Sequence, residues 1–448
     1  MTEKKYKSYT LRNYKKIKQL TKVSEDDIKS IEVVGNVLPF KANNYVIEEL
    51  IDWDNYRDDP IYHLTFPQRE MLSSEHYKIV EEALDNNVSE EKLFSICNDI
   101  REQLNPHPAG QQCLNVPMFD GEQMSGVQHK YRETVLFFPT SGQTCHAYCT
   151  FCFRWPQFVG DKSMKFASKE SRDLAKYLQN HHEVTDLLFT GGDPMTMNFK
   201  VFRKYLDPIW KVIDKTNIQT IRIGTKSLSF WQYRFVTADD AQDMLDLFKM
   251  IVDKGINLAI MAHFNHPVEL STDIVKEAIR NILATGAQIR TQSPIFKHIN
   301  DDPEVWAELW RKQVNLNCIP YYMFMARDTG AKEYFELPIV KAYDIFREAY
   351  SKVSGICRTV RGPSMSCTPG KIMISGIAEL NGEKVLALRF IQGRNPDWVA
   401  TPFFAKYDEE ASCMSDLKPA FSEKFFFEDE MEQIYHQKYS DCEENKFE

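Results

Sequence analysis

Three cysteines lie close together in the segment Cys145-His-Ala-Tyr-Cys149-Thr-Phe-Cys152, and their spacing constrains this chain more than any other feature of its sequence. Thiolates are the usual ligands of iron–sulfur clusters, and a short loop lets three of them converge on one cluster. No fourth cysteine follows nearby. Three thiolates on a four-iron cluster leave one iron open, so we expect a [4Fe–4S] cluster that binds a small molecule at its fourth iron.

Two other interpretations of the three cysteines are weaker. A structural zinc ion takes four ligands, usually as CxxC pairs; His146 is available as a fourth ligand, but no second pair follows at zinc-finger distance. Disulfide bonds are typical of exported proteins, and the first residues lack the apolar stretch of a signal peptide. The ten cysteines therefore indicate a reducing cytoplasm, and we interpret the isolated Cys413 and Cys442 as ordinary thiols.

The composition excludes several classes of protein. A chain of 448 residues with 43% hydrophobic residues can form one large domain or two to three smaller ones. The formal net charge of −9 argues against nucleic-acid binding, and no apolar run is long enough to span a membrane. The first twenty residues are basic with interleaved tyrosines. Such a segment can be an arm that binds nucleic acid, but we expect a solvated terminal helix or arm instead.

The first part of the chain has helical patterns, and its centre alternates strands with helices. Residues 74–87 and 89–104 carry apolar positions at helical spacing, with Ser89 as an N-cap. The expected strands are Thr134–Thr140, Val184–Thr190, Ile218–Gly224, Asn257–Ala262, Ala287–Thr291 and Cys318–Met325, separated by segments such as the helices Ser168–Asn180 and Asp239–Lys254. Alternation at such intervals indicates parallel βαβ units with right-handed crossovers. Six units fit a partial barrel rather than a closed eightfold one.

The loops that leave the carboxyl ends of barrel strands build the active site in such folds, and we call this edge the rim. Polar residues follow the expected strands at the cysteine loop, Gly191-Gly192-Asp193, Lys226-Ser227, His263-Phe264-Asn265-His266-Pro267, Gln292-Ser293 and Arg327-Asp328. Beyond the barrel we expect a helix at Val340–Val353, a strand at Lys384–Ile391 and an acidic, aromatic tail from Asp408. The predicted division is therefore a helical N-terminal region (1–128), a partial barrel (129–340) and a C-terminal region (341–448).

From about His129 to Arg389 the chain resembles the lysine 2,3-aminomutase family of radical S-adenosylmethionine (SAM) enzymes. The matching segments are His129-Lys130-Tyr131, the cysteine loop with Arg154, Thr190-Gly191-Gly192-Asp193, Ile221-Arg222-Ile223-Gly224, residues 263–267, Gln292-Ser293, Pro320-Tyr321-Tyr322, Pro369-Gly370-Lys371 and Leu388-Arg389. The resemblance implies an α/β fold, a partial (β/α)6 TIM-like barrel of the radical SAM type with a helical N-terminal region and a C-terminal extension.

The resemblance also implies the chemistry. In that family the amino and carboxylate groups of SAM chelate the open iron, and the cluster donates an electron that cleaves SAM to a 5′-deoxyadenosyl radical. Pyridoxal 5′-phosphate (PLP) holds the amino acid as an imine while its amino group moves from C2 to C3. The protein positions and shields these cofactors. The implied partners are a small-molecule amino acid and an electron-donating reductase, flavodoxin or ferredoxin, with a homo-oligomer possible. The implied enzyme is cytoplasmic and binds neither nucleic acid nor membrane.

Individual roles follow from the matching positions. Cys145, Cys149 and Cys152 are the implied cluster ligands. The positions implied to contact SAM or PLP are Phe151 (against adenine), Gly191, Gly192, Asp193, His263, Gln292, and Lys130 and Tyr131 near the PLP phosphate. Lys371 corresponds to the PLP lysine, which we expect on a flexible loop, although a surface lysine after a turn is the alternative. Arg154 corresponds to the arginine that pairs with the substrate α-carboxylate, a match for bidentate hydrogen bonding.

The departures from the family concern the substrate. Lysine-specific members hold the distal ammonium with two aspartates, and this chain has Arg327 and Ser364 at those positions, with Asp328 one residue away. An ammonium beside Arg327 is repelled, whereas a second carboxylate is attracted. We therefore expect an amino acid with an acidic or neutral polar side chain, glutamate first. The alternatives are a PLP-independent radical SAM enzyme that abstracts hydrogen from another small molecule or a polypeptide side chain, and a non-catalytic iron–sulfur or zinc protein.

Overall fold

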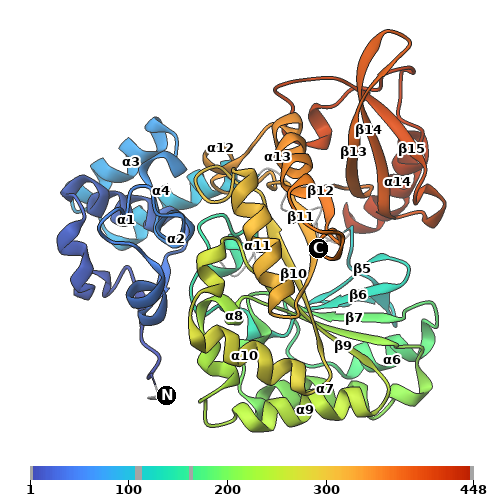
Figure 1. The fold of residues 1–448 in the computed structure, drawn as a ribbon, viewed down its shortest axis with the longest axis horizontal. Helices are drawn as coiled ribbons and strands as arrows, with labels where there is room; N and C mark the ends of the chain where they lie inside the picture. Colours follow the sequence, from blue (N-terminus) through green and yellow to red (C-terminus); the bar gives the residue numbers. More distant parts are fainter. Residues whose placement is uncertain (1–3, 106–113, 161–164, 444–448) are drawn as a thin grey trace.

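The computed structural model describes residues 4–105, 114–160 and 165–443. Figure 1 shows a helical N-terminal region to one side of a central α/β body, with a strand-rich C-terminal region above it. A single sheet of eleven strands runs through the central and C-terminal parts, in the order β15-β14-β13-β12-β11-β10-β9-β8-β7-β6-β5. The cysteine loop leaves this sheet directly after β6.

The middle of the sheet is the parallel barrel. Its strands are β6 (Thr134–Phe137), β7 (Asp186–Phe189), β8 (Thr220–Thr225), β9 (Asn257–His263), β10 (Gln288–Pro294) and β11 (Ile319–Phe324), followed by β12 (Arg361–Ser366). Each is parallel to its neighbour, and β5 (Val127–Tyr131) is antiparallel to β6. The strand order is linear, so the barrel is open. The prediction of a partial barrel is confirmed, and β12 extends the parallel set beyond the six predicted strands.

Amphipathic helices cover the outer face of the barrel (Figure 1). They are α6 (Arg172–Asn180), α7 (Phe199–Trp210), α9 (Ala241–Asp253), α10 (Asp273–Ala284), α11 (Pro303–Asn315) and α13 (Ile339–Ser351), with short helices α8 (Ser227–Phe230) and α12 (Lys332–Phe335) at the rim. In α10 the buried residues Ile274, Val275, Ala278, Ile279 and Ile282 follow the 3.6-residue period. Such a stripe faces the sheet and leaves the charged positions to solvent.

The N-terminal region packs around its own hydrophobic cluster. Its elements are β1 (Ser8–Thr10), β2 (Lys41–Asn43), α1 (Glu25–Val37), α2 (Pro60–Thr65), α3 (Ser74–Asp85) and α4 (Glu90–Gln103). The two predicted helices are confirmed, and the Ser89 side chain accepts from Lys92 N at 3.3 Å as the N-cap of α4. The same cluster includes Ala147 and Trp155 beside the cysteines. The N-terminal region is therefore packed against the cysteine loop.

The expectation of a solvated helix or arm at the N-terminus is wrong. Residues 4–22 form β1 and two 3-10 turns, and Tyr14, Ile17 and Leu20 are buried. The physical reason is the spacing of apolar residues among the lysines, which lets the apolar side chains pack while the lysines face outward.

The C-terminal region extends the sheet with antiparallel strands, β13 (Gly370–Leu380), β14 (Glu383–Gly393) and β15 (Pro402–Lys406), and ends in α14 (Glu428–Glu443). Short strands β3 (Met118–Phe119) and β4 (Glu122–Gln123) pair beside the barrel. The same sheet continues from β11 to β12, on either side of the predicted boundary at residue 340. The division of the chain at residues 128 and 340 therefore stays a prediction. No helix within the described ranges is long and apolar enough to cross a membrane.

Candidate active site

The N-terminal region holds the backbone of the cysteine loop. Tyr148 N donates to Lys41 O at 2.7 Å, and Thr150 N donates to Leu64 O at 3.0 Å. The Thr150 hydroxyl donates to His63 O at 2.7 Å. Since these contacts come from β2 and α2, the loop conformation depends on both the barrel and the N-terminal region.

The three thiols of the loop share one buried environment. Burial raises the pKa of Cys145, and Asp193 and the other two thiols raise it further. Burial likewise raises the pKa of Cys149 and of Cys152, while the Lys226 charge acts against the rise at Cys149. Buried thiolates need a strong positive charge to remain ionised, which the iron ions of a cluster provide. The donor set therefore fits a [4Fe–4S] cluster.

The zinc alternative finds little support. His146 shares a hydrogen bond with Ser227 Oγ at 3.0 Å through Nδ1 and stacks on Trp231. Burial, followed by the charges of Lys41 and Arg234, lowers the pKa of His146 to about 3. His146 is thus a neutral packing residue at the start of the loop.

Gly191 and Gly192 let the loop after β7 approach the start of the cysteine loop. Gly191 has φ +136°, and a Cβ there would lie 2.1 Å from the Gln143 side-chain nitrogen. A Cβ on Gly192 would lie 2.5 Å from Thr144 N. Asp193 N donates to Gly142 O at 3.0 Å and to Thr144 O at 2.7 Å. Only glycine allows this approach. Gly191 and Gly192 therefore have a structural role in positioning the cysteine loop, in addition to any contact with a cofactor.

The Asp193 carboxylate is buried and bonded to protein groups. It accepts from Thr225 Oγ1 at 2.7 Å, Lys226 N at 2.9 Å, Ser227 Oγ at 3.0 Å and Met195 N at 2.9 Å. These bonds join the rim loops after β7 and β8. Direct contact between SAM and Gly191, Gly192 or Asp193 stays a prediction.

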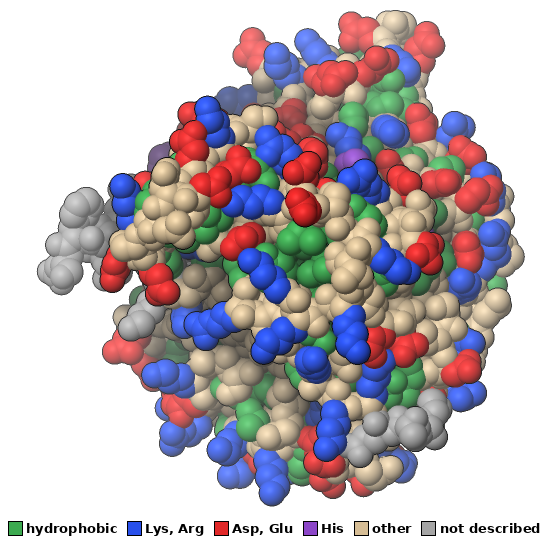
Figure 2. Space-filling model, turned by 90° about the vertical axis from the view of Figure 1, so that its left-hand side faces the viewer, with side chains coloured by type: hydrophobic (Ala, Val, Ile, Leu, Met, Phe, Trp, Pro, Cys, Tyr) green, Lys and Arg blue, Asp and Glu red, His purple; other side chains and the backbone are tan. Residues whose placement is uncertain are grey.

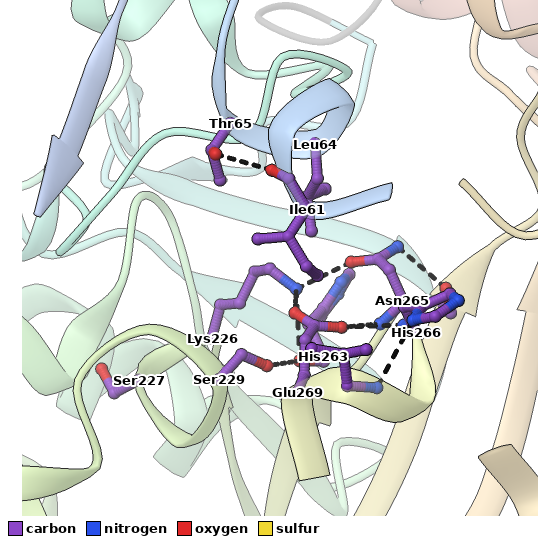
Figure 3. A network of polar contacts seen from close by, with 12 residues as sticks. Ile61, Leu64, Thr65, Lys226, Ser227, Ser229, His263, Asn265, His266 and Glu269 are labelled. Atoms are coloured by element: carbon purple, nitrogen blue, oxygen red, sulfur yellow. Dashed lines mark hydrogen bonds and ion pairs between the residues drawn. The ribbon is translucent and has the colours of Figure 1, made fainter. Parts of the chain in front are cut away.

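A buried ion pair links the next two rim loops, as Figure 3 shows. Lys226 Nζ donates to Glu269 Oε1 at 2.6 Å and to Asn265 Oδ1 at 2.7 Å. Glu269 Oε2 accepts from the backbone nitrogens of Asn265 and His266. The sequence analysis missed Glu269. The signal was its position three residues after His266, which is the acidic position of a capping box.

We expect the substitution Lys226→Met to lower the free energy of unfolding by about 3–5 kcal/mol, because it leaves Glu269 charged and buried without its partner. Urea unfolding of the cluster-free protein measures this loss. The double variant K226M/E269Q should recover most of it, since glutamine still accepts from the backbone. Lys176→Met, which breaks an exposed pair with Asp173, is the matched control. A loss in K226M no larger than in K176M would show that the buried pair does not support the rim.

His263 and Gln292 lie side by side at the ends of β9 and β10. They are direct register partners, and Gln292 Nε2 and His263 Nε2 are 2.7 Å apart. Burial and the Lys226 charge lower the pKa of His263 to about 3, so the ring is neutral. Phe151 packs against Phe296, with ring centroids 4.4 Å apart. Cofactor contacts of His263, Gln292 and Phe151 stay predictions.

Arg154 points a cation into the interior next to the thiols. Its guanidinium lies 4.2 Å from the Phe138 ring centroid, and its Nη2 donates to Gln143 Oε1 at 3.4 Å. Its Nε is buried and has no hydrogen-bond partner in the described part of the chain. Burial lowers the pKa of Arg154 to about 10. A buried cation with an unused donor fits an anionic ligand such as a carboxylate.

Lys371 and Lys130 lie in the same positive environment. Lys371 is the second residue of β13, so the expectation that it lies on a loop is wrong. The side chain is no surface group either: its Nζ lies 4.2 Å from the Tyr322 ring centroid, and burial followed by nearby cations lowers its pKa to about 7. Lys130, next to Tyr131 on β5, donates to Cys367 O, and burial lowers its pKa to about 7 as well.

Arg327 lies at the centre of this group of cations. Its charge acts on Arg154, Lys371 and Lys130. Its side chain is exposed to a cavity of about 530 Å³ that is lined by Lys130, Arg327, Asp328, Cys367, Thr368 and Arg394 among others. Sequence analysis missed Arg394, which donates to Thr368 O at 2.8 Å and to Asn115 Oδ1 at 2.6 Å. Lys371 and Arg154 do not line this cavity, but both lie close enough to Arg327 for its charge to act on them.

The two positions that set substrate charge in the family are now located. Asp328 pairs with Lys332 at 3.3 Å, so its charge is already compensated. Ser364 is fully buried on β12 and donates to Met323 O at 3.3 Å. Neither residue provides an uncompensated carboxylate, and Arg327 provides a cation.

Known iron–sulfur and aminomutase proteins are similar to this chain. A family model described as a 4Fe-4S single cluster domain matches residues 132–263. A protein of Aquifex aeolicus provisionally named an L-lysine 2,3-aminomutase is 29% identical over 80% of this chain and 83% of its own length. The glutamate 2,3-aminomutase of Clostridioides difficile is 24% identical over 59% of this chain, which spans 58% of that enzyme.

Among solved structures, a radical SAM methyltransferase from Sphaerobacter thermophilus matches with a TM-score of 0.34 and 13% identity, over 56% of this chain and 68% of that one. The matched cluster domain contains the three cysteines, the glycine turn and His263, and the aminomutase relatives extend over most of the remaining chain. The chain is therefore similar over most of its length to proteins named lysine 2,3-aminomutase, and it contains a match to a 4Fe-4S single cluster domain.

Proposed function

We propose that this enzyme moves the amino group of an amino acid from C2 to C3, using a [4Fe–4S] cluster, SAM and PLP, and that its substrate carries an acidic or neutral polar side chain. The observation that supports it most is the set of cations beside the cysteine loop. Among the described residues, Arg154, Arg327, Lys130, Lys371 and Arg394 make no ion pair with a carboxylate. Such a site requires anionic ligands.

The residues present fit PLP. When bound, PLP would link the amino group of the substrate to an electron-withdrawing ring. Lys371 would supply the amine that holds the cofactor, and its pKa of about 7 leaves about half of that amine unprotonated at neutral pH. Lys130 and Arg394 lie close enough for each charge to act on the other, and together they offer donors to a phosphate.

The same geometry supports an acidic substrate. Arg154 would hold the α-carboxylate, and Arg327 would hold a second carboxylate at the far end of the side chain. The glutamate 2,3-aminomutase among the relatives acts on such a dicarboxylate. The alternative of a PLP-independent radical SAM enzyme leaves Lys371 and its neighbours without a ligand. A cytoplasmic location, a flavodoxin or ferredoxin as reductant and a homo-oligomer remain part of the proposal.

PLP binding tests this proposal directly. We expect reconstituted protein to gain a Schiff-base absorbance band, and borohydride to fix the mass of PLP on Lys371. Labelling should rise between pH 6 and 8 with a midpoint near 7, because the neutral amine is the reactive form and the pKa of Lys371 is about 7, far below that of an ordinary lysine. Lys371→Ala should lose the label, whereas Lys130→Ala should retain it at Lys371. PLP that binds equally well to K371A would contradict the assignment.

A further inference from the structure

The N-terminal arm, which we define as residues 4–22, is strongly basic on a chain whose net charge is −9. Its charged residues are Lys4, Lys5, Lys7, Arg12, Lys15, Lys16, Lys18 and Lys22, with no aspartate or glutamate among them. Figure 2 shows the side of the molecule on which the N-terminal region lies, and lysine and arginine side chains gather over its lower half. The arm is thus a local positive surface on an acidic protein.

The charges near the start of the arm are available to a partner. Lys5, Lys7 and Arg12 are exposed, and none of them forms an ion pair with any residue that the structure describes. By contrast, Lys4 is paired with Glu48 and Glu49 at 2.8 Å each. Lys4 and Lys5 line a hollow of about 540 Å³ together with three aspartates, Asp239, Asp240 and Asp243. Lys7 and Arg12 do not line this hollow, so an acidic partner would meet the arm chiefly at these two residues.

The arm also reaches the cysteine loop. Tyr6, between Lys5 and Lys7, is 40% exposed, and its hydroxyl donates to His146 O at 2.7 Å. Its ring centroid lies 5.6 Å from that of His146 and 4.9 Å from that of Trp231. His146 is the residue after Cys145. One partly exposed aromatic side chain therefore separates this basic surface from the neighbour of a cluster ligand.

Lys41 strengthens this connection from beneath the arm. Its Nζ donates to Cys145 O at 2.6 Å and lies 6.0 Å from the Tyr6 ring centroid. Burial lowers the pKa of Lys41, and the Cys145 charge opposes that shift. Tyr6, His146 and Lys41 thus connect the arm to Cys145 through direct contacts.

We propose that the N-terminal arm is the docking surface for an acidic one-electron carrier protein, of the flavodoxin or ferredoxin class, that reduces the cluster. The reduced carrier loses one electron and the cluster gains it, passing from [4Fe–4S]²⁺ to [4Fe–4S]⁺, and no covalent bond forms or breaks. Complementary charge attracts the carrier and orients it. The inference rests on a cluster at the three cysteines, but not on the identity of the amino-acid substrate.

A nucleic acid is the other polyanion that a basic arm could bind, and the structure favours the carrier. The interleaved aromatic side chains are used internally: Tyr9 and Tyr14 are buried, and Tyr6 contacts the cysteine loop. They are therefore not free to stack on bases, which is how aromatic residues of single-strand-binding proteins act. The arm's contact with the residue next to Cys145 places a bound electron carrier close to the cluster ligands, whereas a nucleic acid bound there would gain nothing from that position.

The test uses a purified acidic flavodoxin and the variant K5E/K7E/R12E. We expect the variant to bind the flavodoxin at least about tenfold more weakly at low salt, and its cluster to be reduced at least about tenfold more slowly, because electrostatic steering contributes factors of 10–10³. Bleaching of the cluster absorbance in a stopped-flow instrument gives the rate, and calorimetry gives the affinity. The difference should vanish at 1 M salt, where charges are screened within about 3 Å.

The control variant is K211E/K215E/K341E, which reverses three exposed lysines away from the arm and should behave like the unmodified protein. Flavodoxin binding to the cluster-free C145A/C149A/C152A variant separates a failure of docking from a failure of cluster assembly. Equal binding and reduction in K5E/K7E/R12E and the unmodified protein would overturn the proposal. So would a short RNA that binds the arm more tightly than the flavodoxin at the same salt concentration.

Discussion

The variant Cys149→Ala is expected to lose both its cluster and all cleavage of SAM. The unmodified protein, reconstituted without oxygen, should hold about four irons per chain, and dithionite with SAM should yield 5′-deoxyadenosine. Removing one of three thiolates leaves an incomplete set in a buried site whose remaining thiols have raised pKa values and therefore resist ionisation. Iron analysis and chromatography of the nucleoside products measure the two losses.

Matched cysteine variants make this result specific. Cys97→Ala and Cys357→Ala remove thiols that lie outside both the cysteine loop and the cavity beside Arg327, and each should keep its iron and its activity. A C145A/C149A/C152A protein that still bound four irons would show that the cluster is held elsewhere. Cleavage of SAM by C149A at the unmodified rate would contradict the assignment of the loop.

The variant Arg327→Asp is expected to change substrate preference by about one to two orders of magnitude. Under the proposed function, Arg327 attracts a distal carboxylate and repels a distal ammonium. Because the Arg327 side chain is exposed to the cavity, solvent screens part of this effect, and a charge mismatch there costs about 1.5–3 kcal/mol, which corresponds to roughly 10–10²-fold in kcat/KM. The ratio of kcat/KM for glutamate to that for lysine should therefore fall by at least that factor in R327D.

Two further variants separate charge from general damage. Arg327→Lys keeps the positive charge and should retain a preference for glutamate, with weaker binding because the bidentate geometry is lost. Arg347→Asp places the same charge reversal on the exposed face of α13 and should leave the ratio unchanged. An unchanged ratio in R327D would show that Arg327 does not contact the substrate side chain.

Much of the barrel could be predicted from the sequence because its signals are local. Buried parallel strands are short apolar runs, and helices between them have a 3.6-residue period, so the strands from Thr134 to Met325 were found with small errors at their ends. The cysteine spacing and the rim residues were found for the same reason. Each rim segment directly follows a strand, and parallel strands end at one edge.

The parts that were missed depend on contacts between distant residues. Strand β12 and the start of β13 lack an apolar run, and pairing with neighbouring strands decides their conformation; Lys371 was therefore expected on a loop. Arg394 lies 264 residues after Lys130, and only the fold brings their charges together. The N-terminal arm was predicted to be solvated because its many lysines interrupt the apolar residues, so that no regular apolar pattern is visible in the sequence.

The most direct test of the central claim follows the amino group itself. Glutamate labelled with ¹⁵N at its amino group is incubated without oxygen with the reconstituted enzyme, SAM, PLP and a reductant, and the products are analysed by mass spectrometry. We expect 3-aminoglutarate that carries ¹⁵N, formed together with 5′-deoxyadenosine and faster than the corresponding product from lysine. Faster turnover of lysine, or cleavage of SAM with no 3-amino product from either amino acid, would contradict the account.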